Sequence, residues 1–280
     1  MFGAELRWEI IHMELNKIYN MDCLDGMKQL DDECIDLTIT SPPYDNLRTY
    51  NGNIAQWSFE KFQDIAKELY RVTKQGGVVV WIVADATIKG SETGTSFRQA
   101  LFFKEIGFNL HDTMIYEKNG TGACGSNNCY WQTFEYMFVF TKGKIKTVHR
   151  LDNGKPRTKG GIKTGRITKD GIQKVEKRSD AEGKLQLRSN IWRYNVGFTS
   201  GDDKTEHPAV FPELLAQDHI LSWSNEGDIV FDPFMGSGTT AKMALLNKRN
   251  YIGFELDTTY CDIANKRIQD NSELLKEVTC

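Results

Sequence analysis

The sequence predicts an α/β fold in which a largely parallel sheet is covered by helices on both faces. Strands and helices are predicted to alternate along most of the chain. Residues 78–84 form a continuous apolar run, Val-Val-Val-Trp-Ile-Val-Ala, which is typical of a parallel strand buried on both faces. Towards the C-terminus, the turn Gly236-Ser237-Gly238 joins a predicted strand to a predicted helix.

Hydrophobic periodicity and end signals define the elements in order. The helix after Ser58 has its apolar side chains on one face and is expected to end at Gly76-Gly77. Another helix is expected to open at Phe211-Pro212, where proline has its favoured first-turn position. The predicted strands are residues 16–20, 34–40, 78–84, 110–116, 134–141, 228–231 and 251–255, and the remaining predicted helices are residues 24–30, 96–106, 239–247 and 258–270.

The composition excludes several classes of protein. The chain has 280 residues, 40% of them hydrophobic and 11% aromatic, which is enough for a sizeable core and excludes global disorder. No apolar stretch approaches the roughly 18–20 residues of a membrane helix. The first residues lack a secretory signal, and six cysteines are too few for a disulfide scaffold. We therefore expect a soluble, cytoplasmic protein that makes no membrane contact.

Charge is unevenly distributed along the chain. Residues 142–188 contain fifteen Lys and Arg against five Asp and Glu, a local net charge of +10, whereas the rest carries −13 within the overall −3. This window is rich in glycine and poor in aromatic residues, which is typical of an insertion between two well-patterned regions. A solvated loop is one interpretation. The other interpretation is contact with a polyanion. It is favoured because the window carries a large excess of positive charge while the rest of the chain is acidic.

The glycine-rich turn has features of a nucleoside site. Gly236 and Gly238 allow a ligand to approach backbone N–H groups at a helix N-terminus. Glu255 ends the next predicted strand, where its carboxylate can accept hydrogen bonds from both hydroxyls of a ribose. An ordinary tight turn is the alternative, and a Walker-type phosphate loop is excluded because no lysine follows the second glycine. A nicotinamide dinucleotide also fits the glycine pattern, but only 42 residues follow Gly238, too few for the rest of that fold. We therefore expect the N-terminal half to complete the sheet, as in a circular permutation.

A second motif, Ser41-Pro42-Pro43-Tyr44, follows the predicted strand at residues 34–40. Ligands of open α/β sheets lie beyond the carboxyl ends of the strands. The two prolines fix a rigid, extended turn and leave carbonyl oxygens as acceptors. Together with the Ser41 hydroxyl and the Tyr44 ring, these groups suit a planar molecule that carries an amino group. A Pro-Pro turn without such a function is only a stiff loop.

With both motifs present, the chain resembles the S-adenosylmethionine-dependent amino-group DNA methyltransferases. Its order of catalytic motif, basic segment and cofactor motif is similar to the permuted β group of that family, over about residues 16–269. The resemblance implies a circularly permuted, Rossmann-like methyltransferase sheet with an inserted target-recognition segment. It also implies S-adenosylmethionine as the cofactor and double-stranded DNA as the partner. A bacterial, archaeal or phage source is expected, and a homodimer and a separately acting restriction endonuclease are left open.

The resemblance also assigns residues. In the catalytic turn these are Ser41, Pro42, Pro43 and Tyr44. The cofactor is expected to contact Asp22 (through its adenine), Pro208, Phe211, Asp232, Pro233, Phe234, Gly236, Ser237, Gly238, Thr239 and Glu255. Phosphate contacts are expected from Lys142, Lys144, Lys146, Arg150, Lys155, Arg157, Lys159, Lys163 and Arg166. The implied organisation is an extension at residues 1–12 ahead of an alternative start at Met13, a catalytic half at 13–141, a target-recognition insertion at 142–205 and a cofactor-binding half at 206–280.

The implied reaction is direct methyl transfer to an exocyclic nitrogen of a base flipped out of the duplex. Acceptors at Ser41 and Pro42 would draw the amine hydrogens out of the ring plane and localise the nitrogen lone pair. Serine at the first position of the turn is typical of members that act on cytosine N4, whereas an acid or amide is commoner for adenine N6. The alternatives are an adenine-N6 enzyme, a silent DNA-recognition subunit, and an RNA or small-molecule methyltransferase.

Two remaining features are expected to be structural. Cys124 and Cys129 have no second ligand pair nearby, so no metal site is expected. Trp131, Trp192 and Trp223 lie within apolar patterns and are predicted to be core residues.

Overall fold

The structure is a computed structural model that describes residues 13–43, 57–119, 130–156, 166–168, 171–173, 184–195 and 212–278. Tyr44, the loop at 120–128, Arg157, Lys159, Lys163, Pro208 and Phe211 therefore lie outside the described residues. The chain divides into two compact units, one formed by Met1–His149 with Asn190–Cys280 and the other by Arg150–Ser189. Within the described ranges, no helix is long and apolar enough to cross a membrane.

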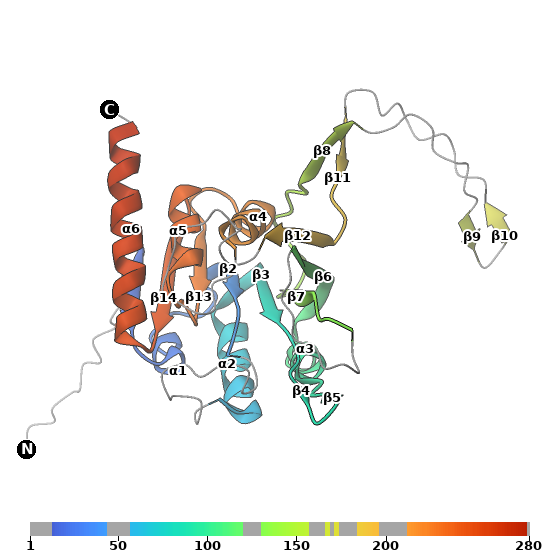
Figure 1. The fold of residues 1–280 in the computed structure, drawn as a ribbon, viewed down its shortest axis with the longest axis horizontal. Helices are drawn as coiled ribbons and strands as arrows, with labels where there is room; N and C mark the ends of the chain where they lie inside the picture. Colours follow the sequence, from blue (N-terminus) through green and yellow to red (C-terminus); the bar gives the residue numbers. More distant parts are fainter. Residues whose placement is uncertain are drawn as a thin grey trace, which may run out of the picture. The chain divides into compact units, whose positions relative to one another are not determined.

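The larger unit is built on a sheet with the strand order β1-β14-β13-β2-β3-β7-β6-β12 (Figure 1). Neighbouring strands run parallel from β1 to β3, β7 is antiparallel to both β3 and β6, and β12 is parallel to β6. The strands are β1 (Lys17–Asn20), β2 (Ile35–Thr40), β3 (Thr73–Val83), β6 (Asn109–Asn119), β7 (Phe134–Thr141), β12 (Ile191–Asn195), β13 (Ile229–Asp232) and β14 (Asn250–Glu255). The C-terminal strands β13 and β14 thus lie between β1 and β2, so the N-terminal half completes the sheet as predicted.

Helices cover both faces of the sheet. They are α1 (Cys23–Met27), α2 (Phe59–Val72), α3 (Thr95–Glu105), α4 (Glu213–Trp223), α5 (Thr239–Leu246) and α6 (Thr258–Val278). Alternate residues of β3, including Trp81, share one core with Met27 of α1, Phe62 of α2 and Phe103 of α3. The intervening residues of β3, such as Val80, are also fully buried. Because side chains alternate across a strand, these point to the opposite face, where α4 and α5 contact β2, β13 and β14. The predicted α/β class is confirmed.

Some predicted boundaries and environments are wrong. Helix α2 ends at Val72, because Thr73 already has extended backbone angles, and Gly76-Gly77 lie inside β3 instead of ending the helix. Strand β12 was not predicted. Trp192 and Trp223 are buried as expected, but Trp131, which precedes β7, is 62% exposed.

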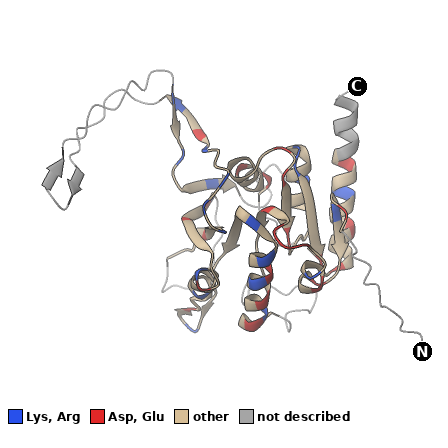
Figure 2. Ribbon diagram, turned by 180° about the vertical axis from the view of Figure 1, so that it is seen from behind, with Lys and Arg blue, Asp and Glu red and all other residues tan. Residues whose placement is uncertain are grey.

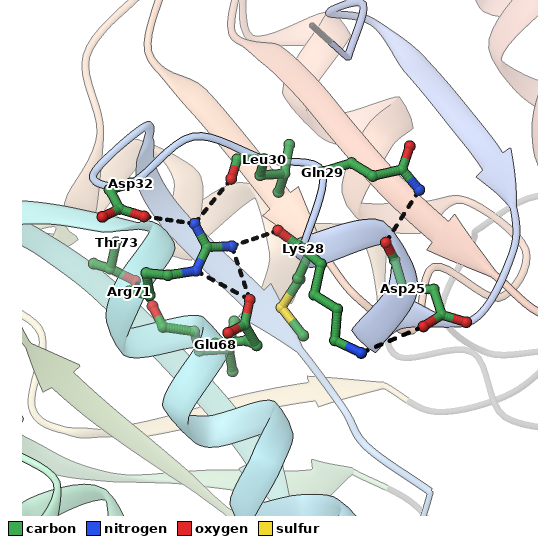
Figure 3. A network of polar contacts seen from close by, with 10 residues as sticks. Asp25, Lys28, Gln29, Leu30, Asp32, Glu68, Arg71 and Thr73 are labelled. Atoms are coloured by element: carbon green, nitrogen blue, oxygen red, sulfur yellow. Dashed lines mark hydrogen bonds and ion pairs between the residues drawn. The ribbon is translucent and has the colours of Figure 1, made fainter. Parts of the chain in front are cut away.

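Arg71 ties α2 to the segment between α1 and β2 (Figure 3). Its guanidinium donates to the carbonyls of Met27 (2.6 Å) and Leu30 (2.9 Å) and pairs with Glu68 (2.8 Å) and Asp32 (2.7 Å). Arg71 thereby satisfies the carbonyl of the last residue of α1 and the carbonyl of Leu30 beyond it. These contacts fix the chain that leads into β2. Along α2, acidic and basic residues alternate in the sequence, and Figure 2 shows both kinds on this helix.

The smaller unit is built from antiparallel pairs. Strand β8 (Asp152–Pro156) pairs with β11 (Leu185–Leu187), and β9 (Arg166–Thr168) pairs with β10 (Gly171–Gln173). The side chains of β8 and β11 are exposed. A further two-stranded hairpin, β4 (Thr87–Ile88) with β5 (Ser91–Glu92), belongs to the larger unit.

Candidate active site

The turn Ser41-Pro42-Pro43 leaves the sheet at the end of β2, between β13 and β3. Strand β2 is paired with β3 up to Thr40, which lies opposite Trp81. Pro42 is buried, and Ser41 and Pro43 are half-buried. The turn that is expected to be catalytic is thus held at the carboxyl edge of the parallel strands, the edge at which α/β proteins bind ligands.

Residues 233–238, which are expected to bind the cofactor and are called the cofactor loop below, leave the neighbouring strand β13 at the same edge. Gly236 and Gly238 have φ values of 53° and 83°, in the left-handed region that favours glycine. The Met235 N–H donates to the Phe254 carbonyl (2.8 Å), and the Gly238 N–H donates to the Met235 carbonyl (3.0 Å). Gly238 is the N-cap of α5 and makes no side-chain cap. The loop therefore folds tightly onto β14 and presents the N-terminus of α5.

Glu255 ends β14 and closes this loop. Its Oε2 accepts the Gly236 N–H and its Oε1 accepts the Asp257 N–H, each at 2.8 Å. Burial raises the pKa of Glu255, although these hydrogen bonds favour the ionised form. Each carboxylate oxygen has a second lone pair. Glu255 can therefore hold the loop and still accept hydrogen bonds from a diol.

Asp22 follows β1 by two residues, and the last residue of β1, Asn20, is paired in the sheet with Glu255 at the end of β14. Asp22 caps α1 by accepting the Leu24 N–H at 2.8 Å, and its other oxygen is 2.8 Å from the ammonium of Lys61. Burial would raise the pKa of Asp22, but the Lys61 and Leu24 hydrogen bonds outweigh it and leave the pKa below its usual value. Asp22 thus lies just beyond the end of β1, and Glu255 ends the neighbouring strand β14.

Asp232, the last residue of β13, is 1% exposed. Its Oδ1 accepts the Thr40 hydroxyl (2.7 Å) and the Phe234 N–H (3.0 Å), and its Oδ2 accepts the Thr240 hydroxyl (2.8 Å). Burial raises the pKa of Asp232 to about 6, against the effect of these three donors. The carboxylate therefore lies inside the protein and joins β2, the cofactor loop and α5.

Three charged side chains that the sequence analysis missed, Arg267, Glu213 and Lys242, form a network that contacts the cofactor loop at Ser237. Ser237 and Thr239 are each 4% exposed. Arg267 of α6 donates to the Ser237 carbonyl at 2.7 Å and to its hydroxyl at 3.2 Å. Arg267 also pairs with Glu213 (2.6 Å), which pairs with Lys242 of α5 (2.7 Å). These contacts join residues up to 54 positions apart, so local patterns carried no signal for them.

Other predicted site residues are placed as follows. Pro233 is buried, and the Phe234 ring packs edge-on against Trp57 at 5.6 Å. Lys142 is 6% exposed; its ammonium donates to the Tyr70 carbonyl (2.8 Å) and lies 3.1 Å from Glu33. Lys142 is therefore engaged inside the fold, unlike the exposed Lys144, Lys146, Arg150 and Lys155.

The arrangement suits S-adenosylmethionine. Two left-handed glycines open the approach to a helix N-terminus, and Glu255 keeps lone pairs for a ribose. A Cβ at Gly238 would lie 2.8 Å from that of Ala264, so the loop is packed too closely for another residue there. With a rigid turn of acceptors beside this cradle, fold and site define a class, the S-adenosylmethionine-dependent methyltransferases.

The chain belongs to the N6/N4 DNA methylase family, whose model, described as DNA methylase, matches residues 35–266. It is 57% identical over 251 residues to the orphan methyltransferase M.BamHII of Bacillus amyloliquefaciens, covering 87% of this chain and 92% of that protein. The structure of the M1.HpyAVI–SAM complex aligns with a TM-score of 0.59 at 25% identity, covering 90% of this chain and 98% of the other. The cytosine-N4-specific PvuII DNA methyltransferase aligns with a TM-score of 0.67 at 19% identity, covering 95% and 93%. The protein is an S-adenosylmethionine-dependent DNA methyltransferase of the N6/N4 class, which confirms the predicted cofactor.

Proposed function

We propose that the protein methylates the exocyclic N4 of a cytosine that is flipped out of duplex DNA, and that Ser41-Pro42-Pro43-Tyr44 is its catalytic turn. The observation that carries this proposal is the position of the turn. It leaves β2 at the same edge at which the cofactor loop leaves the adjacent strand β13. An amino group bound at the turn would thus be next to the cofactor cradle.

The cofactor contacts are assigned to the chain's own groups. Glu255 accepts hydrogen bonds from the ribose, Asp22 accepts one from the adenine amino group, and the backbone of Gly236 and Gly238 lines the approach. When bound, S-adenosylmethionine supplies an electrophilic methyl group on a positively charged sulfur. Arg267 holds the loop in place by donating hydrogen bonds to Ser237 and Thr239. We propose that Pro208 and Phe211, which precede α4, complete the site.

Ser41 and Pro42 act on the amine of the base. An exocyclic amine is a poor nucleophile because its lone pair is delocalised into the ring. The Ser41 hydroxyl and the Pro42 carbonyl accept its two hydrogens and draw them from the ring plane, which localises the lone pair on nitrogen. Tyr44 stacks on the flipped base, whose extrusion costs a few kcal/mol. Catalysis then comes from positioning and preorganised acceptors.

This mechanism needs no nucleophilic thiol. Among the described residues the cysteines are Cys23, Cys34 and Cys261, and burial raises the pKa of each, that of Cys23 to about 12. These three side chains are neutral thiols at neutral pH. They are unsuited to the covalent attack on a base carbon that a different class of methyltransferase would need.

The observation that supports cytosine over adenine is the neutral serine at the first position of the turn. Recognition of the target is assigned to residues 142–205, within which residues 150–189 form a unit of their own. We propose that the exposed Lys144, Lys146, Arg150 and Lys155 contact phosphates.

Substitution of the turn tests this proposal. Ser41→Ala should lower the single-turnover rate of labelled methyl transfer to DNA by roughly 100-fold, since one preorganised acceptor is lost. Its Kd for S-adenosylmethionine should stay within about 3-fold. Ser91→Ala, in the exposed β4–β5 hairpin, is the matched control and should be fully active. Full activity of Ser41→Ala would remove the turn from the mechanism.

A further inference from the structure

The carboxyl ends of β2 and β13 are joined by a side chain and not by the sheet. The β2–β13 ladder pairs Leu37 with Val230 and Thr38 with Phe231, and it ends there. Beyond it, the hydroxyl of Thr40 donates to Asp232 at 2.7 Å. This hydrogen bond continues the connection between the two strands at the point where one becomes the catalytic turn and the other the cofactor loop.

Asp232 has its hydrogen-bonding capacity directed at the protein itself. Its two oxygens accept from three donors, namely Thr40 before the catalytic turn, Phe234 in the cofactor loop and Thr240 in the first turn of α5. All of this lies in the interior: Thr40 is fully buried, and Thr240 and Asp232 are each 1% exposed. A buried carboxylate with this set of donors is a rigid junction, and it is poorly placed to contact a bound molecule.

We propose that Asp232 is a positioning residue that sets the distance between the catalytic turn and the cofactor loop, instead of the direct cofactor ligand that the family pattern suggested. The inference rests on the proposed catalytic role of Ser41-Pro42. Thr40 is bonded directly to Ser41, and the prolines that follow have fixed φ angles, so any shift of Thr40 is passed to the acceptors. Methyl transfer demands near-attack alignment, and a misplacement of about 1 Å can lower a rate by about 100-fold.

Valine substitutions test the junction because valine replaces a hydroxyl of threonine by a methyl group of similar size. Thr40→Val should lower the single-turnover rate of total methyl transfer by about 10–100-fold at saturating cofactor, while the Kd for S-adenosylmethionine stays within about 3-fold. Thr40→Ser keeps the hydroxyl and should restore the rate to within about 3-fold of wild type. Scoring total label in DNA makes the result independent of which base is methylated.

The chain offers a matched control two residues earlier. Thr38 lies on the same strand, is fully buried, and its hydroxyl has no hydrogen-bond partner in the described structure. Thr38→Val makes the same chemical change in the same environment and should leave both rate and Kd unchanged. A general loss of packing in β2 would slow Thr38→Val as much as Thr40→Val, and that outcome would overturn the inference.

Further variants separate a junction from a cofactor ligand. Thr240→Val breaks the contact of Asp232 with α5 and should show the same split between rate and Kd, which also provides an answer if Thr40→Val does not fold. Thr40→Val and Asp232→Asn should not be additive, because both break the same hydrogen bond. Adding Thr40→Val to the Asp232→Asn variant should therefore lower the rate by a smaller factor than adding it to the wild type. If Asp232→Asn instead raises the Kd for S-adenosylmethionine and leaves the methyl-transfer rate at saturating cofactor unchanged, Asp232 is a direct ligand of the cofactor. Full activity of Ser41→Ala, with Thr40→Val slow, would contradict the proposed turn and leave the junction standing.

Discussion

The contacts of Glu255 predict how much cofactor affinity is lost when its carboxylate is removed. Its two oxygens accept the Gly236 and Asp257 N–H groups, each at 2.8 Å, and their remaining lone pairs are assigned to the ribose hydroxyls. Glu255→Ala removes these ribose contacts. Hydrogen bonds to a charged group contribute about 1.5–3 kcal/mol each. The loss of two should weaken cofactor binding by about 3 kcal/mol, or roughly 100-fold in Kd.

Glu255→Gln separates the ribose contact from the support of the loop. Glutamine keeps the size of the side chain but turns one acceptor into an NH₂ donor, which faces a backbone N–H. We expect the Kd of Glu255→Gln for S-adenosylmethionine to be roughly 10-fold above that of wild type and roughly 10-fold below that of Glu255→Ala. Isothermal titration with S-adenosylmethionine measures both variants. Glu226→Gln, in an exposed ion pair with Lys248, is the control and should bind normally.

The refuting result is an unchanged Kd. If Glu255→Ala is folded by circular dichroism and still binds S-adenosylmethionine as wild type does, the carboxylate does not contact the ribose. Loss of affinity in Glu255→Ala together with wild-type affinity in Glu255→Gln would point to shape instead of charge.

Three further predictions follow from other parts of the site. Gly238→Ala should lower both thermal stability and cofactor affinity. An alanine there would have left-handed backbone angles, which cost about 1–2 kcal/mol, and its Cβ would overlap Ala264 of α6. A melting temperature equal to that of wild type would contradict this packing. Burial raises the pKa of Asp232 to about 6 from 3.8, so the stability it contributes is present below about pH 4 and lost as the pH rises through 6. In urea titrations the wild type should lose on the order of 2 kcal/mol relative to Asp232→Asn between pH 4 and 7, and parallel curves would refute the shift. Replacing Lys144 and Lys146 by glutamine should reduce the slope of log K for DNA against log salt by about 0.9 each, while Lys67→Gln on α2 should not change it.

The parts of the fold that were predicted are those encoded locally. The apolar run of β3 and the glycine turn before α5 carry their signal within about ten residues, and both elements are found. The interleaved strand order followed from the position of Gly238 near the C-terminus. By contrast, β12 is five residues long and depends on pairing with β6, some 76 positions earlier, so it has little pattern of its own.

The side-chain contacts of the site were less predictable for the same reason. Thr40 and Asp232 meet across 192 positions. The sequence placed Lys142 in a basic window, but its partners Tyr70 and Glu33 come from elsewhere in the chain. A motif predicts which residues gather at a site. It does not tell whether a carboxylate such as Asp232 faces the ligand or the protein.

We propose that this protein transfers a methyl group to the amino nitrogen of cytosine in DNA. The most direct test is nucleoside mass spectrometry of unmethylated DNA after incubation with the protein and isotopically labelled S-adenosylmethionine. We predict label in N4-methylcytosine, abolished by Ser41→Ala. Label in N6-methyladenine would keep the fold, cofactor and turn and overturn the choice of base. No label in either nucleoside, despite measurable cofactor binding, would contradict the proposed methyl transfer to DNA.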